Sequence, residues 1–146
     1  MNNYSDASRG TFQNEEYAKQ LVSFEGMRFR GRDGKNNVTP TDIDGLVQLD
    51  NENCVIFFEL KHKDGMPRGQ LLALQDVCDA VEAGGRNSIV FLATHGTPAG
   101  QTIAAKDAET RTYYWRGEWR DIKPPKTLYE AINQFIGFVK AKGETT

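Results

Sequence analysis

The stretch Thr41–His62, TDIDGLVQLDNENCVIFFELKH, decides which fold we expect of this chain. Its two ends, Thr41–Leu49 and Cys54–Lys61, are rich in Ile, Leu, Val and Phe, which favour β-strands. Between them, Asp50–Asn53 is a cluster of polar residues that favour turns. We therefore predict an antiparallel hairpin that is symmetric about the middle of this cluster.

The place of the turn also predicts the register of the hairpin. A two- or four-residue loop opposes positions whose numbers sum to 103, so that Asp44 lies opposite Glu59 and Asp42 opposite Lys61. Directly opposed residues share a face of the sheet, and so do alternate residues along a strand. One face is therefore expected to carry these four charged side chains, unless a one-residue bulge scrambles the assignment. The other face is expected to be apolar, with Ile43, Val47, Leu49, Cys54, Ile56, Phe58 and Leu60.

Carboxylates gathered beside a lysine on one sheet face are a poor source of stability. Like charges opposite each other are unfavourable, and each raises the pKa of its neighbour unless a cation lies between them. A divalent metal gives the carboxylates a use, because Mg²⁺ prefers hard oxygen ligands. A nearby lysine can then orient an attacking water or neutralise charge on phosphate. The simpler alternative is an amphipathic hairpin with ordinary ion pairs such as Asp42–Lys61.

The order of these residues resembles a known family. Asp44, followed after fifteen residues by Glu59-Leu60-Lys61, is similar to the signature of the PD-(D/E)xK nuclease superfamily. The resemblance implies an α/β fold with a restriction-endonuclease-like αβββαβ core, a central mixed sheet flanked by helices. It implies Mg²⁺ or Mn²⁺ held by Asp44, Glu59 and the backbone carbonyl of Leu60, with Lys61 as the catalytic lysine. The chain has Thr41–Asp44, TDID, where a Pro-Asp pair is expected, so either Asp42 or Asp44 is the ligand.

The same resemblance suggests two auxiliary residues. A helix is expected from Thr11, and related nucleases often carry a glutamate on their first helix; we favour Glu15, with Glu16 and Glu25 as alternatives. The glutamates near the helix start are also explained by the helix dipole alone. Several branches of the superfamily place a glutamine after the catalytic strand, which here is Gln70. Otherwise Gln70 is an exposed residue of a first helical turn.

Basic residues flank the expected site on both sides in the sequence. Met27–Arg32 alternates apolar and basic residues, which suits an edge strand before a loop over Asp33–Pro40. Such a stripe is often a solvated strand face, but beside the acidic cluster it would contact backbone phosphates. The expected nucleic-acid contacts are Arg28, Arg30, Arg32, Lys63 and Arg68.

The segment after the hairpin reads as a crossover to a further strand. Pro67–Ala83 has the apolar spacing of a helix and is followed by two glycines. Ser88–Thr94, SIVFLAT, is almost entirely apolar, which is typical of a strand covered on both faces. A helical crossover makes this strand parallel to Cys54–Lys61. His95–Asp107 is then a long connection, either a substrate flap or a plain surface loop.

The last third of the chain predicts a hairpin and a helix. Thr112–Arg116 and Glu118–Ile122 flank Gly117 and carry Tyr and Trp residues that serve either for packing or for stacking on unpaired bases. Pro124-Pro125 is expected to end this hairpin, and Thr127 to cap a helix that reaches about Ala141.

Composition sets the broad class. With 146 residues, 38% hydrophobic and 26% charged, we expect one domain over residues 1–146, with 1–10 a loose arm and 142–146 a tail. A net charge of −2 argues against a protein that coats DNA by charge alone. Cys54 and Cys78 are expected to be reduced and buried. No apolar run approaches the length of a membrane span, so no membrane contact and a cytoplasmic location are expected.

These observations lead to two functional hypotheses. The first is a metal-dependent endonuclease that hydrolyses phosphodiester bonds in DNA, whether duplex, branched or single-stranded, with RNA as another candidate substrate. The second is a non-catalytic nucleic-acid- or protein-binding module on the same fold. A phage or mobile-element origin suits either hypothesis, and a homodimer would let two sites cut two strands.

Overall fold

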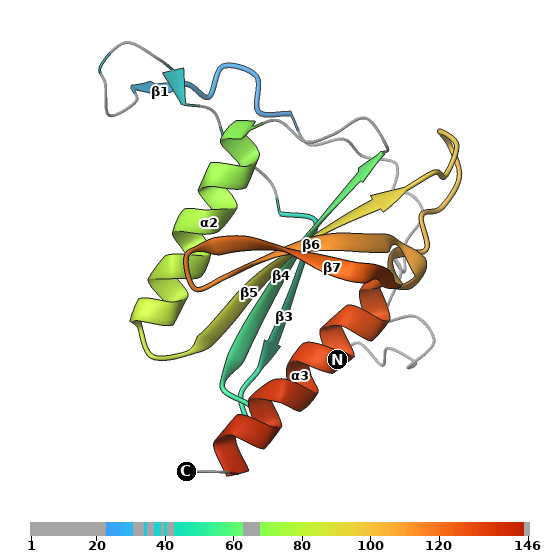
Figure 1. The fold of residues 1–146 in the computed structure, drawn as a ribbon. Coiled ribbons are helices and arrows are strands. Elements are labelled where there is room, and N and C mark those ends of the chain that lie inside the picture. Colours follow the sequence, from blue (N-terminus) through green and yellow to red (C-terminus); the bar gives the residue numbers. More distant parts are fainter. Residues whose placement is uncertain are drawn as a thin grey trace, which may run out of the picture. The chain divides into compact units, whose positions relative to one another are not determined.

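The computed structural model describes residues 23–30, 34, 37–38, 40, 43–62 and 68–144. The chain divides into two units, Met1–Pro40 and Thr41–Thr146, and each is described by itself. Figure 1 labels the elements of both units.

The first unit contains a short two-stranded sheet. Strand β1 (Phe29–Arg30) pairs antiparallel with β2 (Asn37–Val38). The expected edge strand Met27–Arg32 is therefore shorter than predicted, and the expected loop Asp33–Pro40 contains a strand. Both residues of β1 are exposed. Alternation of apolar and polar residues marks strand pairing in a sequence only where one face of the strand is buried. Because β1 has no buried face, the sequence does not reveal this pair.

The second unit is an α/β structure built on a five-stranded mixed sheet. Its strands follow one another in the order β3, β4, β5, β6, β7. The pairs β3/β4, β5/β6 and β6/β7 are antiparallel, whereas β4/β5 is parallel. The strand bounds are β3 Gly45–Leu49, β4 Cys54–His62, β5 Asn87–His95, β6 Glu109–Trp115 and β7 Glu118–Thr127.

The central hairpin has the register that its sequence predicts. Gly45 pairs with Phe58 and Leu49 with Cys54, so opposed positions sum to 103. The backbone N–H of Asn53 donates to the Asp50 carbonyl oxygen at 3.1 Å and closes the turn. Strand β3 begins at Gly45 rather than Thr41. The turn therefore fixed the pairing, while the strand start lay four residues beyond the prediction.

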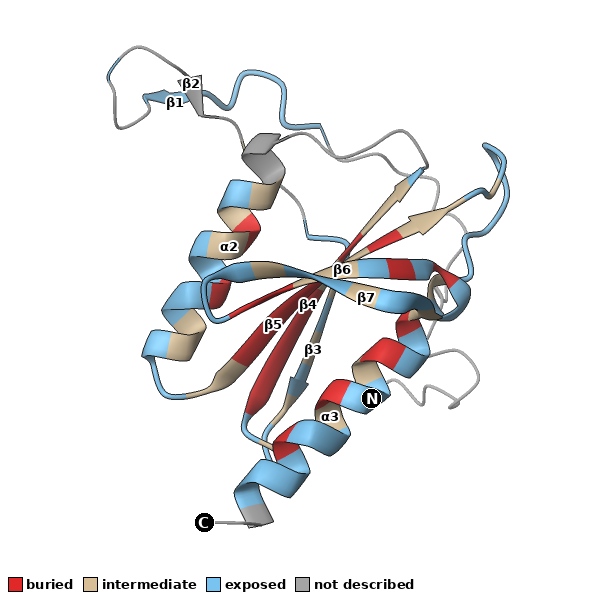
Figure 2. Cartoon of the chain, in the orientation of Figure 1, coloured by how far each residue is buried: buried red, intermediate tan, exposed pale blue. Residues whose placement is uncertain are grey.

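Helix α2 (Arg68–Ala83) connects the two parallel strands, as expected of a crossover. Strand β5 runs one residue further at each end than predicted, from Asn87 to His95. Figure 2 shows buried residues concentrated along β4 and β5, the two strands at the centre of the second unit. Their nearly continuous apolar sequence reflects burial on both faces of the sheet.

The two α-helices among the described residues of the second unit lie on opposite faces of the sheet, as Figure 1 shows. On one face, Leu74 and Cys78 of α2 pack with Val55 and Phe57 of β4. The other face is covered by α3 (Leu128–Glu144). A second hydrophobic cluster lies on this face, where alternate residues of β4 and β5 pack against one side of α3. Its members include Cys54, Ile56, Ile89, Phe91, Ala93, Leu128, Ala131, Phe135 and Val139. Both cysteines are free and buried, as predicted.

The C-terminal hairpin is longer than its sequence suggests. Strand β7 continues through Pro124-Pro125 to Thr127, so the two prolines do not end it. The pairing shifts between Thr110 and Thr112, where β7 is irregular. Strand β7 ends the sheet order, and an edge strand tolerates proline because one row of its backbone groups has no ladder partner. The expected loop His95–Asp107 includes a 3₁₀ turn, Ala105–Asp107.

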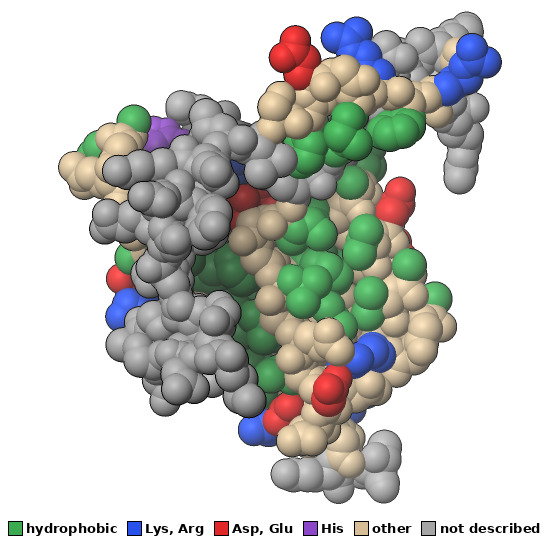
Figure 3. All heavy atoms as spheres, turned by 180° about the vertical axis from the view of Figure 1, so that it is seen from behind, with side chains coloured by type: hydrophobic (Ala, Val, Ile, Leu, Met, Phe, Trp, Pro, Cys, Tyr) green, Lys and Arg blue, Asp and Glu red, His purple; other side chains and the backbone are tan. Residues whose placement is uncertain are grey.

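Helix α3 begins where the sequence predicts. The Thr127 hydroxyl oxygen accepts a hydrogen bond from the backbone N–H of Glu130 at 3.2 Å, which is an N-cap. In the described part of the chain, no helix is both long and apolar enough to cross a membrane. Figure 3 shows the reverse side, where apolar side chains are visible between charged ones. Large exposed apolar residues of the second unit include Leu46, Leu72 and Val77.

Candidate active site

Asp44 and Glu59 meet at the end of the hairpin. The backbone N–H of Asp44 donates to Glu59 Oε2 at 3.4 Å. In return, the backbone N–H of Leu60 donates to Asp44 Oδ2 at 2.7 Å. The second bond is short and charge-assisted, and it fixes the Asp44 carboxylate against β4. The two side chains therefore converge on one place, as the register predicts.

Glu59 is a buried carboxyl group at a strand end. Its exposure is 1%, and alternation along β4 places it on the face that Val55 and Phe57 share with α2. Burial, together with repulsion and a side-chain hydrogen bond from the neighbouring Asp44, raises the pKa of Glu59 to about 7. The two carboxyl groups thus lie near enough to share a proton. Near neutral pH, Glu59 changes its charge readily.

Lys61 is the nearby cation of this cluster. It lies two residues after Glu59 on β4 and therefore on the same face, and it is half-buried. Its ammonium group lowers the pKa of Glu59, opposing the effects of burial and Asp44. Lys61 thus lies within electrostatic range of the carboxyl pair. In register with these residues, β5 places Leu92 beside Glu59 and Thr94 beside Lys61.

Sequence reasoning missed the backbone contribution of Leu60. Its carbonyl oxygen as a metal ligand stays a prediction, and in addition its N–H holds Asp44. The signal was present in the predicted register, because Leu60 follows the residue that opposes Asp44. Hydrogen-bond direction cannot be read from residue types alone, so the anchor emerges only from the three-dimensional structure.

The described structure does not test the other candidate residues. Glu15, Glu16, Arg32, Asp42 and Lys63 lie outside the described residues, as do the side chains of Arg68 and Gln70. Arg68 and Gln70 belong to the first turn of α2. Arg28, Arg30 and Glu25 are exposed residues of the first unit. Their proposed contacts with DNA or metal stay predictions.

The fit of a metal ion depends on the carboxyl pair. Within the described ranges, no group of three or more His, Cys, Asp or Glu side chains could hold a metal ion. Mg²⁺ is often bound by only one or two carboxylates, with water and phosphate oxygens as further ligands. Asp44 and Glu59 supply two such oxygen donors, and their mutual repulsion is the electrostatic situation that a cation relieves. The donor set therefore suits Mg²⁺ or Mn²⁺ and does not suit a structural zinc site.

Comparison of the chain with protein-family models, with curated proteins and with solved structures gives no match. The likeness to PD-(D/E)xK nucleases therefore rests on Asp44, Glu59 and Lys61 and on the hairpin that carries them.

Proposed function

We propose that this protein is a metal-dependent nuclease that hydrolyses phosphodiester bonds in DNA. One observation carries the proposal, namely that the buried Glu59 and the exposed Asp44 converge at a strand end, with Lys61 on the same face. An amphipathic hairpin gains nothing from burying a glutamate against an aspartate, because both burial and repulsion disfavour its charged form. Binding of a cation gives the pair a favourable role.

Each residue then has a role that follows from its surroundings. Asp44, held by the Leu60 N–H, and Glu59 would bind Mg²⁺ or Mn²⁺, with the Leu60 carbonyl as a further donor. When bound, the ion supplies positive charge to the reacting phosphate and lowers the pKa of water. Lys61 orients the attacking water or balances charge on the phosphate. Gln70 and Glu15 are proposed as auxiliary residues.

The proposal also includes the type of fold that carries the site. The hairpin β3–β4, helix α2 and strand β5 form a ββαβ unit that carries the site. We propose that this unit is part of a restriction-endonuclease-like αβββαβ core. The basic residues Arg28, Arg30, Arg32, Lys63 and Arg68 are proposed to contact DNA backbone, and two copies of the chain to act on two strands.

Cleavage assays test the proposed activity. Plasmid DNA, single-stranded DNA and RNA are incubated with the protein over a range of Mg²⁺ and Mn²⁺ concentrations. We expect cutting that requires metal, and a loss of about 100-fold or more in Asp44→Asn and Lys61→Met. Asp107→Asn and Lys106→Met are matched controls, because both residues are exposed on the 3₁₀ turn, whose Ala105 packs on the α3 side of the sheet and not on the side of Glu59. Binding of DNA without any metal-dependent cutting would instead support the non-catalytic module.

A measurement of metal binding tests the metal ligands independently of DNA cleavage. If Mg²⁺ binds the folded state and not the unfolded state, it should raise the unfolding temperature of the protein by mass action. We expect this increase in the wild type and in Lys61→Met, but a much smaller one in Glu59→Gln. Equal increases in wild type and Glu59→Gln would contradict the assignment of Glu59 as a ligand.

A further inference from the structure

A groove lies between the C-terminal hairpin and helix α3. Its volume is about 420 Å³. It opens on the face of the sheet that α3 covers, since Ile89 and Phe91 at its floor belong to the α3 cluster. The Glu59 side chain lies on the other face. The groove is therefore a separate feature and not an extension of the carboxyl site.

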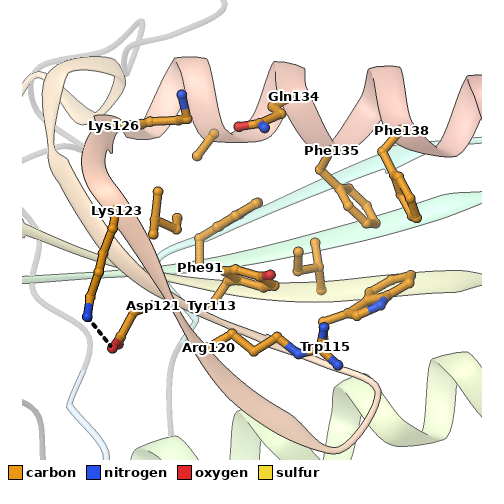
Figure 4. A pocket seen from close by; sticks show the side chains of 13 residues that line it. Phe91, Tyr113, Trp115, Arg120, Asp121, Lys123, Lys126, Gln134, Phe135 and Phe138 are labelled. Carbon is orange, nitrogen blue, oxygen red and sulfur yellow. Dashed lines mark ion pairs between the residues drawn. The ribbon is translucent and has the colours of Figure 1, made fainter.

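Aromatic side chains form the walls of the groove, as Figure 4 shows. Trp115 and Phe135 are buried and their ring centroids lie 5.3 Å apart. Phe138 of α3 is different, because 52% of it is exposed although it points into the groove. The Trp115 ring contacts it edge to face, with centroids 6.1 Å apart and planes at 87°. Phe138 is thus held in place with one side open to a ligand.

Basic side chains from β7 also line the groove, and they form its rim. Arg120, Lys123 and Lys126 all line the groove. Because β7 is irregular between Asp121 and Lys126, Arg120 and Lys126 pair with Tyr113 and Thr110 of β6, which lie three steps or roughly 10 Å apart along that strand. A single phosphate cannot reach along such a row. A nucleic-acid strand can reach along it, because a stacked strand has one phosphate per about 3.4 Å.

The acidic residues near this rim do not block an anion. Arg120 pairs with Glu118 at 3.2 Å, and Lys123 pairs with Asp121 at 3.9 Å. All four side chains are at least 48% exposed. Ion pairs this exposed contribute little, so a phosphate can replace the carboxylate partner at small cost. Among the described residues, Lys126 forms no ion pair of this kind and offers its charge to the groove directly.

We propose that this groove binds single-stranded nucleic acid. Bases stack on Phe138 and on the Tyr113 ring, which also lines the groove, while backbone phosphates follow Arg120, Lys123 and Lys126. An aromatic platform beside a row of cations is the combination by which proteins bind unpaired strands without sequence preference. The amide of Gln134, which also lines the groove, is placed to hydrogen-bond a base edge. The site lies beyond the proposed nuclease centre and needs neither its metal nor its carboxylates.

The stacking half of the proposal is tested by fluorescence anisotropy. A labelled oligothymidylate of about 12 nucleotides is titrated with protein in EDTA. We expect Phe138→Ala to weaken binding at least about fivefold, the lower end for loss of one stacked base. Tyr129→Ala is the matched control, because Tyr129 is a more exposed aromatic residue of the same helix that does not line the groove. It should bind like the wild type.

The charge half is tested through salt dependence. Each lost phosphate contact to a single strand lowers the slope of log affinity against log salt by about 0.7. The double variant Lys123→Gln/Lys126→Gln should therefore lower it by about 1.4. Lys106→Gln/Lys140→Gln removes the same charge from exposed lysines outside the groove and should leave the slope nearly unchanged.

Three outcomes would overturn the proposal. The first is an oligonucleotide affinity that is unchanged in both Phe138→Ala and the lysine double variant. The second is no binding by the wild type at low salt. The third is full competition by thymidine monophosphate at the same concentration as the oligonucleotide, which would make the groove a site for one nucleotide. Because EDTA is present throughout, none of these results depends on whether the carboxyl site cuts DNA.

Discussion

Gly45 lies opposite Phe58 in the β3–β4 pair, and the Phe58 ring fills the space where a side chain at position 45 would stand. A Cβ atom built on Gly45 would overlap three carbon atoms of that ring. Gly45 directly follows Asp44, whose carboxylate the Leu60 N–H holds against β4. Glycine at this position is thus a packing requirement of the hairpin that carries the site.

Gly45→Ala is therefore expected to destabilise the protein. The added methyl group must displace the Phe58 ring or separate the strands, which costs about 1–3 kcal/mol as for other overpacked sites. Metal-dependent activity should fall as well, since Asp44 moves with its neighbour. Urea unfolding and the cleavage assay measure the two effects.

Gly137→Ala is the matched control for this change. Gly137 is an exposed residue inside α3, and no atom lies within 4 Å of a Cβ built on it. The same substitution there should stabilise the protein by up to about 1 kcal/mol, because glycine disfavours a helix interior. If both variants lost stability equally, the contact between Gly45 and the Phe58 ring would not be the cause.

Tyr114→Phe is expected to loosen the contact between β6 and α2. The buried Tyr114 hydroxyl donates to the Asp79 carboxylate, with distances of 2.8 and 3.0 Å to its two oxygens. Loss of a hydrogen bond to a charged acceptor costs about 1–2 kcal/mol here, since Asp79 itself is exposed. Tyr129→Phe, on an exposed ring, should be neutral in the same thermal unfolding measurement. A neutral result for Tyr114→Phe would mean that water replaces the hydroxyl without loss.

The hairpin was predictable from sequence because two independent signals agree on it. The polar cluster Asp50–Asn53 fixes the centre of the turn, and the alternation around it fixes the register. The same signals predict Asp44 beside Glu59, where the structure has it. The burial of Glu59 could not be foreseen, because it depends on α2 covering that face of the sheet.

Other parts of the fold carry weaker local signals. Strand β1 has two exposed residues, too few for any period to be visible. Pro124-Pro125 indicated an end, but an edge strand can pass through prolines, and edge position is a property of the assembled sheet. The groove could not be predicted either. Its walls come from Trp115 on β6 and Phe138 on α3, which only the packing of that helix brings together.

Glu59 predicts how stability changes with pH when no divalent metal is present. Its pKa is raised from 4.5 to about 7 in the folded protein, so the folded state holds a proton more tightly than the unfolded chain. This contribution to stability is complete below about pH 4.5 and is lost as the pH rises through about 7. Glu59→Gln keeps the neutral form at every pH. It should exceed the wild type by about 1–2 kcal/mol near pH 8, and the two should agree near pH 4.

The neighbours of Glu59 should shift this transition in opposite directions. Asp44 raises the pKa of Glu59 and Lys61 lowers it. In EDTA, Asp44→Asn is therefore expected to move the midpoint of the pH-dependent loss of stability to lower pH, and Lys61→Met to higher pH. Stability is measured by thermal unfolding across the pH range, for each variant and for the same variant with Glu59→Gln added. The midpoint is read from the difference in stability between the two. That subtraction removes every effect of pH on stability that does not involve Glu59. Midpoints that move the same way in both variants would mean that charge does not govern Glu59, and the electrostatic reason for a cation at this site would fail.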